Sequence, residues 1–358
     1  MDARDILHRR INTQRLAGDP FARPEDMVRS LVGVQSQDYG NARWSVGQRT
    51  ANCTDADVAR AFDEGRILRT HVLRPTWHFV TPEDIRWLLT LTAPRVHALN
   101  AYSYRQLDLD DAIFARCETL ITDTLQGGNQ LTRPGLAALL ADAGIVANAL
   151  RLSYIMMHAE LDGLICSGAM RGKQHTYALL EERASQATTW THEESLAELA
   201  LRFFSGHGPV SLRDYVRWSG LTVADARAGL EMVKAELTEV ELDGTTLWYR
   251  ESAIPPLPTE KVAYLLPEYD ECVLTYRDVG FPDRSRGGAV DPSATVFDRP
   301  VIVDRQRAGT WRRMVGSKAV TVDVTLFTSL TAVETTALDA ALARYSAFIQ
   351  LPVTVTLL

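Results

Sequence analysis

The sequence has few cysteines, no long hydrophobic run and no excess of positive charge. Its four cysteines lie far apart, without the Cys-x-x-Cys or Cys/His spacing of a zinc site. We therefore expect reduced, mostly buried thiols, no metal and no other cofactor. No stretch approaches 18 consecutive apolar residues, and the first residues are polar rather than a signal-peptide core. These absences argue against a membrane-spanning or disulfide-rich protein and predict a cytoplasmic one.

The charge balance is slightly acidic. The 358 residues include 38 Lys and Arg against 45 Asp and Glu, a formal net charge of −7. A nucleic-acid footprint needs only a local basic face, because counterion release depends on the few phosphates contacted. The balance therefore weakens a DNA-binding hypothesis without excluding it.

The order of predicted elements repeats three times along the chain: amphipathic helices followed by a β-hairpin. The predicted hairpins pair residues 67–74 with 76–80, 164–167 with 176–179, and 238–242 with 245–250. Asp243-Gly244 is a strong signal for the two-residue turn of the third. Helices followed by a hairpin are typical of a winged helix. We predict an α+β, mainly helical protein with three tandem winged-helix units, at residues 1–105, 106–188 and 189–254, plus a small C-terminal α+β unit at 255–358.

Proline-containing segments predict several boundaries. Residues 255–258 read as a stiff linker before the last unit, and residues 280–294 as a turn-rich insertion. A helix is expected from residues 81–84 to Leu91, with Pro94 as its break.

Three amide or acid side chains are packed into four residues behind the second predicted helix. They are Gln35, Gln37 and Asp38. On a regular helix the two glutamines would diverge by about 200°. We therefore expect them at the C-terminal end of the helix that begins near Pro24, with Gly40-Asn41 as its stop.

The segment Gly33-Val34-Gln35-Ser36-Gln37-Asp38, followed by Ala42-Arg43-Trp44, resembles the Gln-x-Gln active-site segment of the AlkZ-like winged-helix DNA glycosylases. Residues 69–80, 265–274 and 309–313 are similar to further signatures of that family, in the same order. Ser36 stands where a smaller or apolar residue such as alanine is expected. The resemblance implies a monofunctional hydrolase for DNA repair that removes alkylated bases, purines substituted at N7 or N3, from double-stranded DNA.

The two glutamines suit that reaction. An alkylated purine is already cationic and leaves readily, so the reaction needs a well-placed water more than a strong acid. A carboxamide accepts one hydrogen bond and donates another, so Gln35 and Gln37 are the predicted catalytic residues. Asp38 is a further candidate, as general base, with a helix-capping carboxylate as the alternative. For the glutamines the alternative is a polar helix end bonded to a neighbouring unit.

Basic and hydrogen-bonding residues of two hairpins are the predicted DNA contacts. Arg69 and Arg74 suit phosphates, with pairing to Asp or Glu as the alternative, and His78 is equally consistent with a structural histidine bonded to backbone. The tip at residues 171–175 is basic and has no apolar reason for burial. The full set is Arg69, Arg74, Thr76, His78, Arg171 and Lys173.

Two more features have alternative interpretations. Trp44 could stack on a base but is expected in the core. Asp270-Glu271 resembles the carboxylate pair of a metal or glycosidase site, yet the spacing reveals no ligand partners, so a structural role is expected.

Two function classes stay open. In one, the glutamines cleave an alkylated base from its sugar; in the other, a regulator of the same fold binds DNA without chemistry. We expect a monomer that is associated with the nucleoid when it is bound to DNA. Glutamines facing a cleft with room for water would favour the enzyme.

Overall fold

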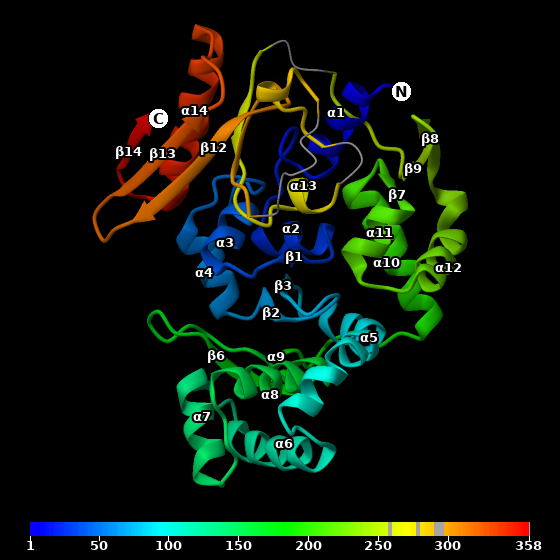
Figure 1. The fold of residues 1–358 in the computed structure, drawn as a ribbon, viewed down its shortest axis with the longest axis vertical. Coiled ribbons are helices and arrows are strands. Elements are labelled where there is room, and N and C mark those ends of the chain that lie inside the picture. Colours follow the sequence, from blue (N-terminus) through cyan, green and yellow to red (C-terminus); the bar gives the residue numbers. More distant parts are fainter. Residues whose placement is uncertain (257–259, 277–279, 290–296, 358) are drawn as a thin grey trace.

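The computed structural model describes residues 1–256, 260–276, 280–289 and 297–357 (Figure 1). Leu257 and Pro258 of the predicted linker, and residues 290–294 of the predicted insertion, lie outside this range. The fold is mixed α+β, mostly helical, with several small sheets. None of the helices in the described residues is long and apolar enough to cross a membrane.

The first group of elements surrounds a three-stranded antiparallel sheet. After α1 (Ala3–Thr13), it comprises α2 (Pro24–Ser30), β1 (Val34–Gln35), α3 (Tyr39–Gly47), α4 (Asp55–Asp63), β2 (Leu68–His71) and β3 (Trp77–Val80). β3 is the central strand and pairs with both β1 and β2. The long helix α5 (Ile85–Gln106) then leads to the second group.

The same order of elements returns twice. The second group comprises α6 (Asp111–Leu125), β4 (Leu131–Thr132), α7 (Arg133–Asp142), α8 (Ala149–Leu161), β5 (Ile165–Ser167) and β6 (Thr176–Leu179), followed by α9 (Leu180–Arg183). The third comprises α10 (His192–His207), β7 (Val210–Ser211), α11 (Leu212–Ser219), α12 (Val223–Val233), η1 (Lys234–Glu236), β8 (Thr238–Leu242) and β9 (Thr245–Tyr249). All three predicted hairpins are confirmed.

Each hairpin gains a third strand that the sequence pattern did not predict. The sheet orders are β1-β3-β2, β4-β6-β5 and β7-β9-β8, and the added strand always lies between the first two helices of its group. These strands are only two residues long, which is too short for a period-two pattern to show. Their backbone groups are satisfied by the neighbouring hairpin rather than by local sequence.

The C-terminal part is a five-stranded sheet covered by a helix. Its elements are β10 (Ala263–Leu265), α13 (Glu271–Leu274), η2 (Arg284–Arg286), β11 (Pro300–Val303), β12 (Gln306–Val315), β13 (Val320–Leu326), α14 (Ala332–Ile349) and β14 (Val353–Leu357). Neighbouring strands are antiparallel except β13 and β14. β14 was not predicted.

One hydrophobic core joins the C-terminal sheet to the first group. Trp44 of α3 is 3% exposed, as expected for a core residue, and its rings lie 5.0 Å from both Tyr345 and Phe348 of α14. Its indole nitrogen donates to the carbonyl of Leu265 at 2.7 Å. Two hydrophobic clusters contain buried residues from more than one group, so the groups pack against one another. The division into units at residues 105, 188 and 254 stays a prediction.

Two predicted helix ends are wrong. α2 ends at Ser30, and the left-handed backbone of Val32 (φ 67°) turns the chain into β1, so Gln35 lies on a strand. Gly40-Asn41 stops no helix, since both residues lie inside α3. α5 also continues through Pro94 to Gln106. Buried side chains on both sides of the proline hold that helix together, which outweighs the hydrogen bond that proline removes.

The carboxylates of Asp270 and Glu271 are completely buried at the start of α13. Asp270 forms two hydrogen bonds, of 2.7 and 2.9 Å, with the equally buried Arg49. Glu271 accepts from the backbone nitrogen of Gln35 at 3.0 Å and from the indole nitrogen of Trp218 at 2.8 Å. Both carboxylates therefore join α13 to other parts of the chain.

Removing one member of this buried pair should strongly destabilise the fold. We expect Asp270→Ala to lower the free energy of unfolding by about 3–5 kcal/mol, because Arg49 would be left as an uncompensated buried charge. Glu231→Ala is the matched control: it breaks the exposed Lys234–Glu231 pair (3.5 Å) and should change stability by less than about 1 kcal/mol. Urea unfolding of both variants measures this, and equal midpoints would contradict the expectation.

Candidate active site

The segment Gln35-Ser36-Gln37 follows β3 as far as Ser36, and the chain bends at Gln37. Gln35 pairs with His78, and the backbone nitrogen of Ser36 donates to the carbonyl of Trp77 at 2.7 Å. The side-chain oxygen of Gln37 accepts from the backbone nitrogen of Trp77 at 3.4 Å. Gln37 is exposed, whereas Gln35 is 6% exposed. The two amides therefore lie in different surroundings, one open and one buried.

An inserted tripeptide separates the strand from the next helix in this group alone. In the second and third groups, Thr132 and Ser211 end the short strand and cap the following helix directly. In the first group, residues 36–38 intervene between β1 and α3. Asp38 is the last of them and caps α3, its Oδ1 accepting from the backbone nitrogen of Asn41 at 2.7 Å. The insertion is what carries Gln37 outward.

Gln37 lines a pocket of about 400 Å³ between the first and second groups. Four of the lining side chains are aromatic or imidazole rings and two are arginines, while none is a carboxylate. We call it the Gln37 pocket. Its lining residues are Gln37, Tyr39, Arg69, Trp77, Arg133, Pro134, Gln174, His175 and Tyr177.

The indole of Trp77 contacts two side chains of β2, Arg69 and His71. The guanidinium of Arg69 lies 4.2 Å from the ring centroid, and the centroid of the His71 imidazole is 4.3 Å away. Glu160 of α8, which is 1% exposed, accepts from the indole nitrogen at 3.4 Å and also bonds His71. Since α8 belongs to the second group, this wall of the pocket depends on how the two groups dock.

Arg69 is itself 8% exposed. Its Nε donates to the carbonyl of Ser36 at 3.0 Å, and burial lowers the pKa of its guanidinium. Arg69, which was predicted to contact a phosphate, is thus a buried residue of the pocket lining.

A buried polar chain leads from β3 to Gln35. His78 has no exposed surface, and burial, followed by the charge of Arg74, lowers its pKa well below the usual value. In its neutral form Nδ1 donates to the carbonyl of Thr76 at 3.0 Å and Nε2 accepts from Arg74 at 3.2 Å. Arg74 in turn donates to the side-chain oxygen of Gln35 at 2.8 Å and to the carbonyl of Trp218. His78 is therefore bonded to backbone, as in the structural alternative to a DNA contact.

The predicted hairpin tip lies beside the pocket. Arg171 and Lys173 are exposed in the loop between β5 and β6, and Arg171 donates to the carbonyl of Gln130 at 3.0 Å. The same loop contributes Gln174 and His175 to the pocket. The structure thus brings Gln37, Arg69 and the tip loop to one pocket. Its lining residues do not include Gln35, Arg74, Thr76 or His78.

Sequence reasoning did not identify Tyr39, Arg133 and Tyr177 as site residues. Tyr39 follows the glutamine segment directly, which was a usable signal. Arg133 and Tyr177 reach the pocket only because the second group docks there, about 100 residues or more along the chain, and no local pattern marks them.

Comparisons with known proteins agree with the family resemblance. The sequence profile of the family described as DNA glycosylase AlkZ-like matches residues 28–348. The "Interstrand DNA cross-link repair glycosylase" of Streptomyces sahachiroi is 26% identical over 330 residues, 83% of this chain and 85% of that protein. Among solved structures, Streptomyces sahachiroi DNA glycosylase AlkZ matches with a TM-score of 0.79 and 22% sequence identity, over 99% of this chain and 100% of that chain. The latter match shows that the fold is shared.

The imidazole of His175 should remain neutral at ordinary pH. Burial, then the charges of Arg69 and Arg43, lower its pKa to about 4. The unfolded chain takes up a proton near pH 6.5 and the folded chain only near pH 4, so folding stability falls as pH decreases through this window. NMR titration of the imidazole measures the pKa directly. His175→Gln should remove this share of the pH dependence, and an apparent pKa of 6 or higher would contradict the burial argument.

Proposed function

The chain belongs to the AlkZ-like DNA glycosylase family, and we propose that it hydrolyses the N-glycosidic bond of alkylated purines in double-stranded DNA. The observation that carries this proposal is the position of Gln37. Its amide lies at the edge of a ring-lined pocket, next to a buried arginine, where a base rotated out of the duplex could be received. A volume of about 400 Å³ lies within the range of small-molecule sites.

The proposed chemistry is placement of water without a titrating base. An N7- or N3-alkylated purine leaves as a neutral base once the bond to C1′ breaks, so protonation of the leaving group is not required. The Gln37 amide would accept a hydrogen bond from the attacking water while it donates to water or the sugar-phosphate backbone. Lining residues of the pocket include no carboxylate, which supports this division of roles.

Gln35 is buried and does not line the Gln37 pocket, so its proposed part in holding the water depends on the orientation that Arg74 gives its amide. Its side-chain oxygen is occupied by Arg74, so the amide nitrogen is the atom left to donate. Arg74 and His78 would then be positioning residues for Gln35, and Thr76 holds His78 through its carbonyl. The direct DNA contacts that we predicted for Arg69, Arg74, Thr76 and His78 stay predictions, and their contacts in the structure favour positioning roles.

DNA binding is proposed to rest on the repeated groups. We read each helix-strand-helix-helix-hairpin group as a winged helix, and the chain as a monomer that holds the duplex between them. Arg171 and Lys173 are exposed beside the pocket and suit phosphates flanking the rotated base. The Streptomyces sahachiroi relative is described as repairing interstrand cross-links, which favours bulky alkylated purines as substrates to test first.

Replacing Gln37 should separate catalysis from binding. We expect Gln37→Ala to lose base excision by about 30- to 1000-fold, since one positioned polar group supplies about 2–4 kcal/mol of transition-state stabilisation. DNA affinity should be retained, because phosphate contacts supply most of it. The measurements are single-turnover release of 7-methylguanine and duplex binding. Gln35→Ala should behave similarly, whereas Asp38→Asn should be mild because asparagine also caps helices.

Gln106→Ala, at an exposed position at the end of α5, is the matched control and should behave as wild type. A Gln37→Ala protein with the parental rate would reject the glutamine mechanism. A wild-type protein that binds duplex DNA but releases no alkylated base would support the regulator instead.

The hairpin tip should contribute to the salt dependence of binding. Arg171→Ala and Lys173→Ala are each expected to weaken duplex binding regardless of sequence and to reduce the slope of log K against log salt by about 1. Lys234→Ala is the control, because Lys234 follows α12 on the other side of the molecule from the tip loop (Figure 1). Fluorescence anisotropy at several salt concentrations measures the slopes, and an unchanged slope in both tip variants would remove these contacts from the proposal.

A further inference from the structure

A second cluster of ligand-type side chains lies where α5 meets α8. We propose that His97, His158 and Asp162 bind a divalent first-row transition metal ion such as Zn²⁺, which clamps these two helices together. The proposal is independent of the glycosylase activity. It departs from our expectation of no metal, which rested on local Cys and His spacing.

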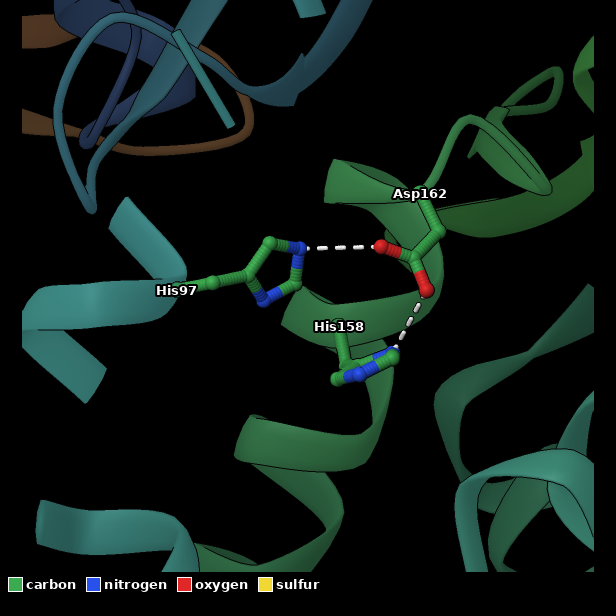
Figure 2. Close-up of side chains that lie close together, drawn as sticks. All are labelled: His97, His158 and Asp162. Atoms are coloured by element: carbon green, nitrogen blue, oxygen red, sulfur yellow. Dashed lines mark ion pairs between the residues drawn. The ribbon is translucent and has the colours of Figure 1, made fainter. Parts of the chain in front are cut away.

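The ligand atoms already converge. One nitrogen atom from each histidine and one carboxylate oxygen of Asp162 lie within 4.8 Å of one another. Nε2 of His97 is 2.9 Å from Oδ1 of Asp162, and Nδ1 of His158 is 3.0 Å from Oδ2. Figure 2 shows both imidazoles directed at this one carboxylate, each at a different oxygen. Tetrahedral ligands at about 2.1 Å from a zinc ion lie roughly 3.4 Å apart, so small side-chain rotations suffice.

The local sequence explains the arrangement. His158 and Asp162 are four residues apart at the C-terminal end of α8, which puts them on one face of the helix. His97 comes from the opposing helix α5, 61 residues earlier in the chain. No spacing motif could have revealed this set, because the third ligand depends on the packing of two helices.

The surroundings hold the rings in place. Nδ1 of His97 lies 3.1 Å from the hydroxyl oxygen of Tyr104. This contact gives the ring an outer hydrogen-bond partner, as metal-bound histidines have, and leaves Nε2 to face Asp162. The imidazole of His158 is stacked on Phe114, with centroids 3.6 Å apart and planes at 18°. Asp162 is 49% exposed, so an ion has access from solvent and water can complete its coordination.

A metal ion here would act on the wall of the Gln37 pocket. Asp162 is two residues from Glu160, whose carboxylate holds the indole of Trp77. Fixing the end of α8 against α5 would therefore also fix the position of Glu160. The role we infer for the ion is structural, and no step of the hydrolysis passes through it.

The test uses full-length, untagged protein stripped with a chelator and titrated with Co²⁺ and then with Zn²⁺. We expect one equivalent to bind, visible as Co²⁺ absorption bands that Zn²⁺ abolishes, and a melting temperature raised by about 3–5 °C at 100-fold excess over Kd. His97→Gln and His158→Gln should each weaken binding by more than about 100-fold, and Tyr104→Phe by about 10- to 100-fold.

The matched control is His192→Gln, which removes an exposed histidine lying 3.9 Å from Asp225 and should bind Zn²⁺ as wild type does. Circular dichroism confirms that each variant is folded. Wild-type protein that binds neither ion would overturn the proposal and identify the cluster as a plain His-Asp-His hydrogen-bond group. So would Zn²⁺ binding that is equal in wild type, His97→Gln and His158→Gln, since the ion would then lie elsewhere.

Discussion

The pair of buried carboxylates at the start of α13 is the constraint on which the arrangement of the other parts depends. Glu271 accepts hydrogen bonds from the backbone nitrogen of Gln35 and the indole nitrogen of Trp218. Asp270 accepts from the guanidinium of Arg49. A buried carboxylate is costly unless its oxygens are bonded, so these contacts must form together. They join the first group, the third group and the C-terminal part. The strand that carries the glutamines is therefore held by residues 236 positions away in the chain.

The candidate site arises from a small departure from a repeated plan. All three groups share the order of helices and strands, but only the first inserts residues between its short strand and the next helix. That insertion lets Gln35 stay in the sheet, bonded to Arg74, while Gln37 reaches the pocket. A continuous helix would have turned the two amides to different sides. In the structure, too, the surroundings of the two amides differ, because Gln35 is buried in the sheet and Gln37 is exposed at the pocket.

The other half of the site comes from the second group. Glu160 of α8 accepts from the indole of Trp77 in the pocket wall, and Arg133, His175 and Tyr177 reach the pocket from the same group. Local positive charge at the pocket explains how a chain of net charge −7 can still suit DNA. For the affinity to phosphates, the positive charge at the contact surface counts more than the net charge of the chain.

What the sequence determined by itself was the family and the order of helices and hairpins. Strand patterns and the Asp243-Gly244 turn are local signals, so the β2–β3, β5–β6 and β8–β9 hairpins followed from them. Tertiary structure alone decided that Gln35 lies on a strand, that α5 passes Pro94, and that His78 is buried. Each of these depends on partners far along the chain, such as β3 for β1, whose packing and hydrogen bonds outweigh local preference.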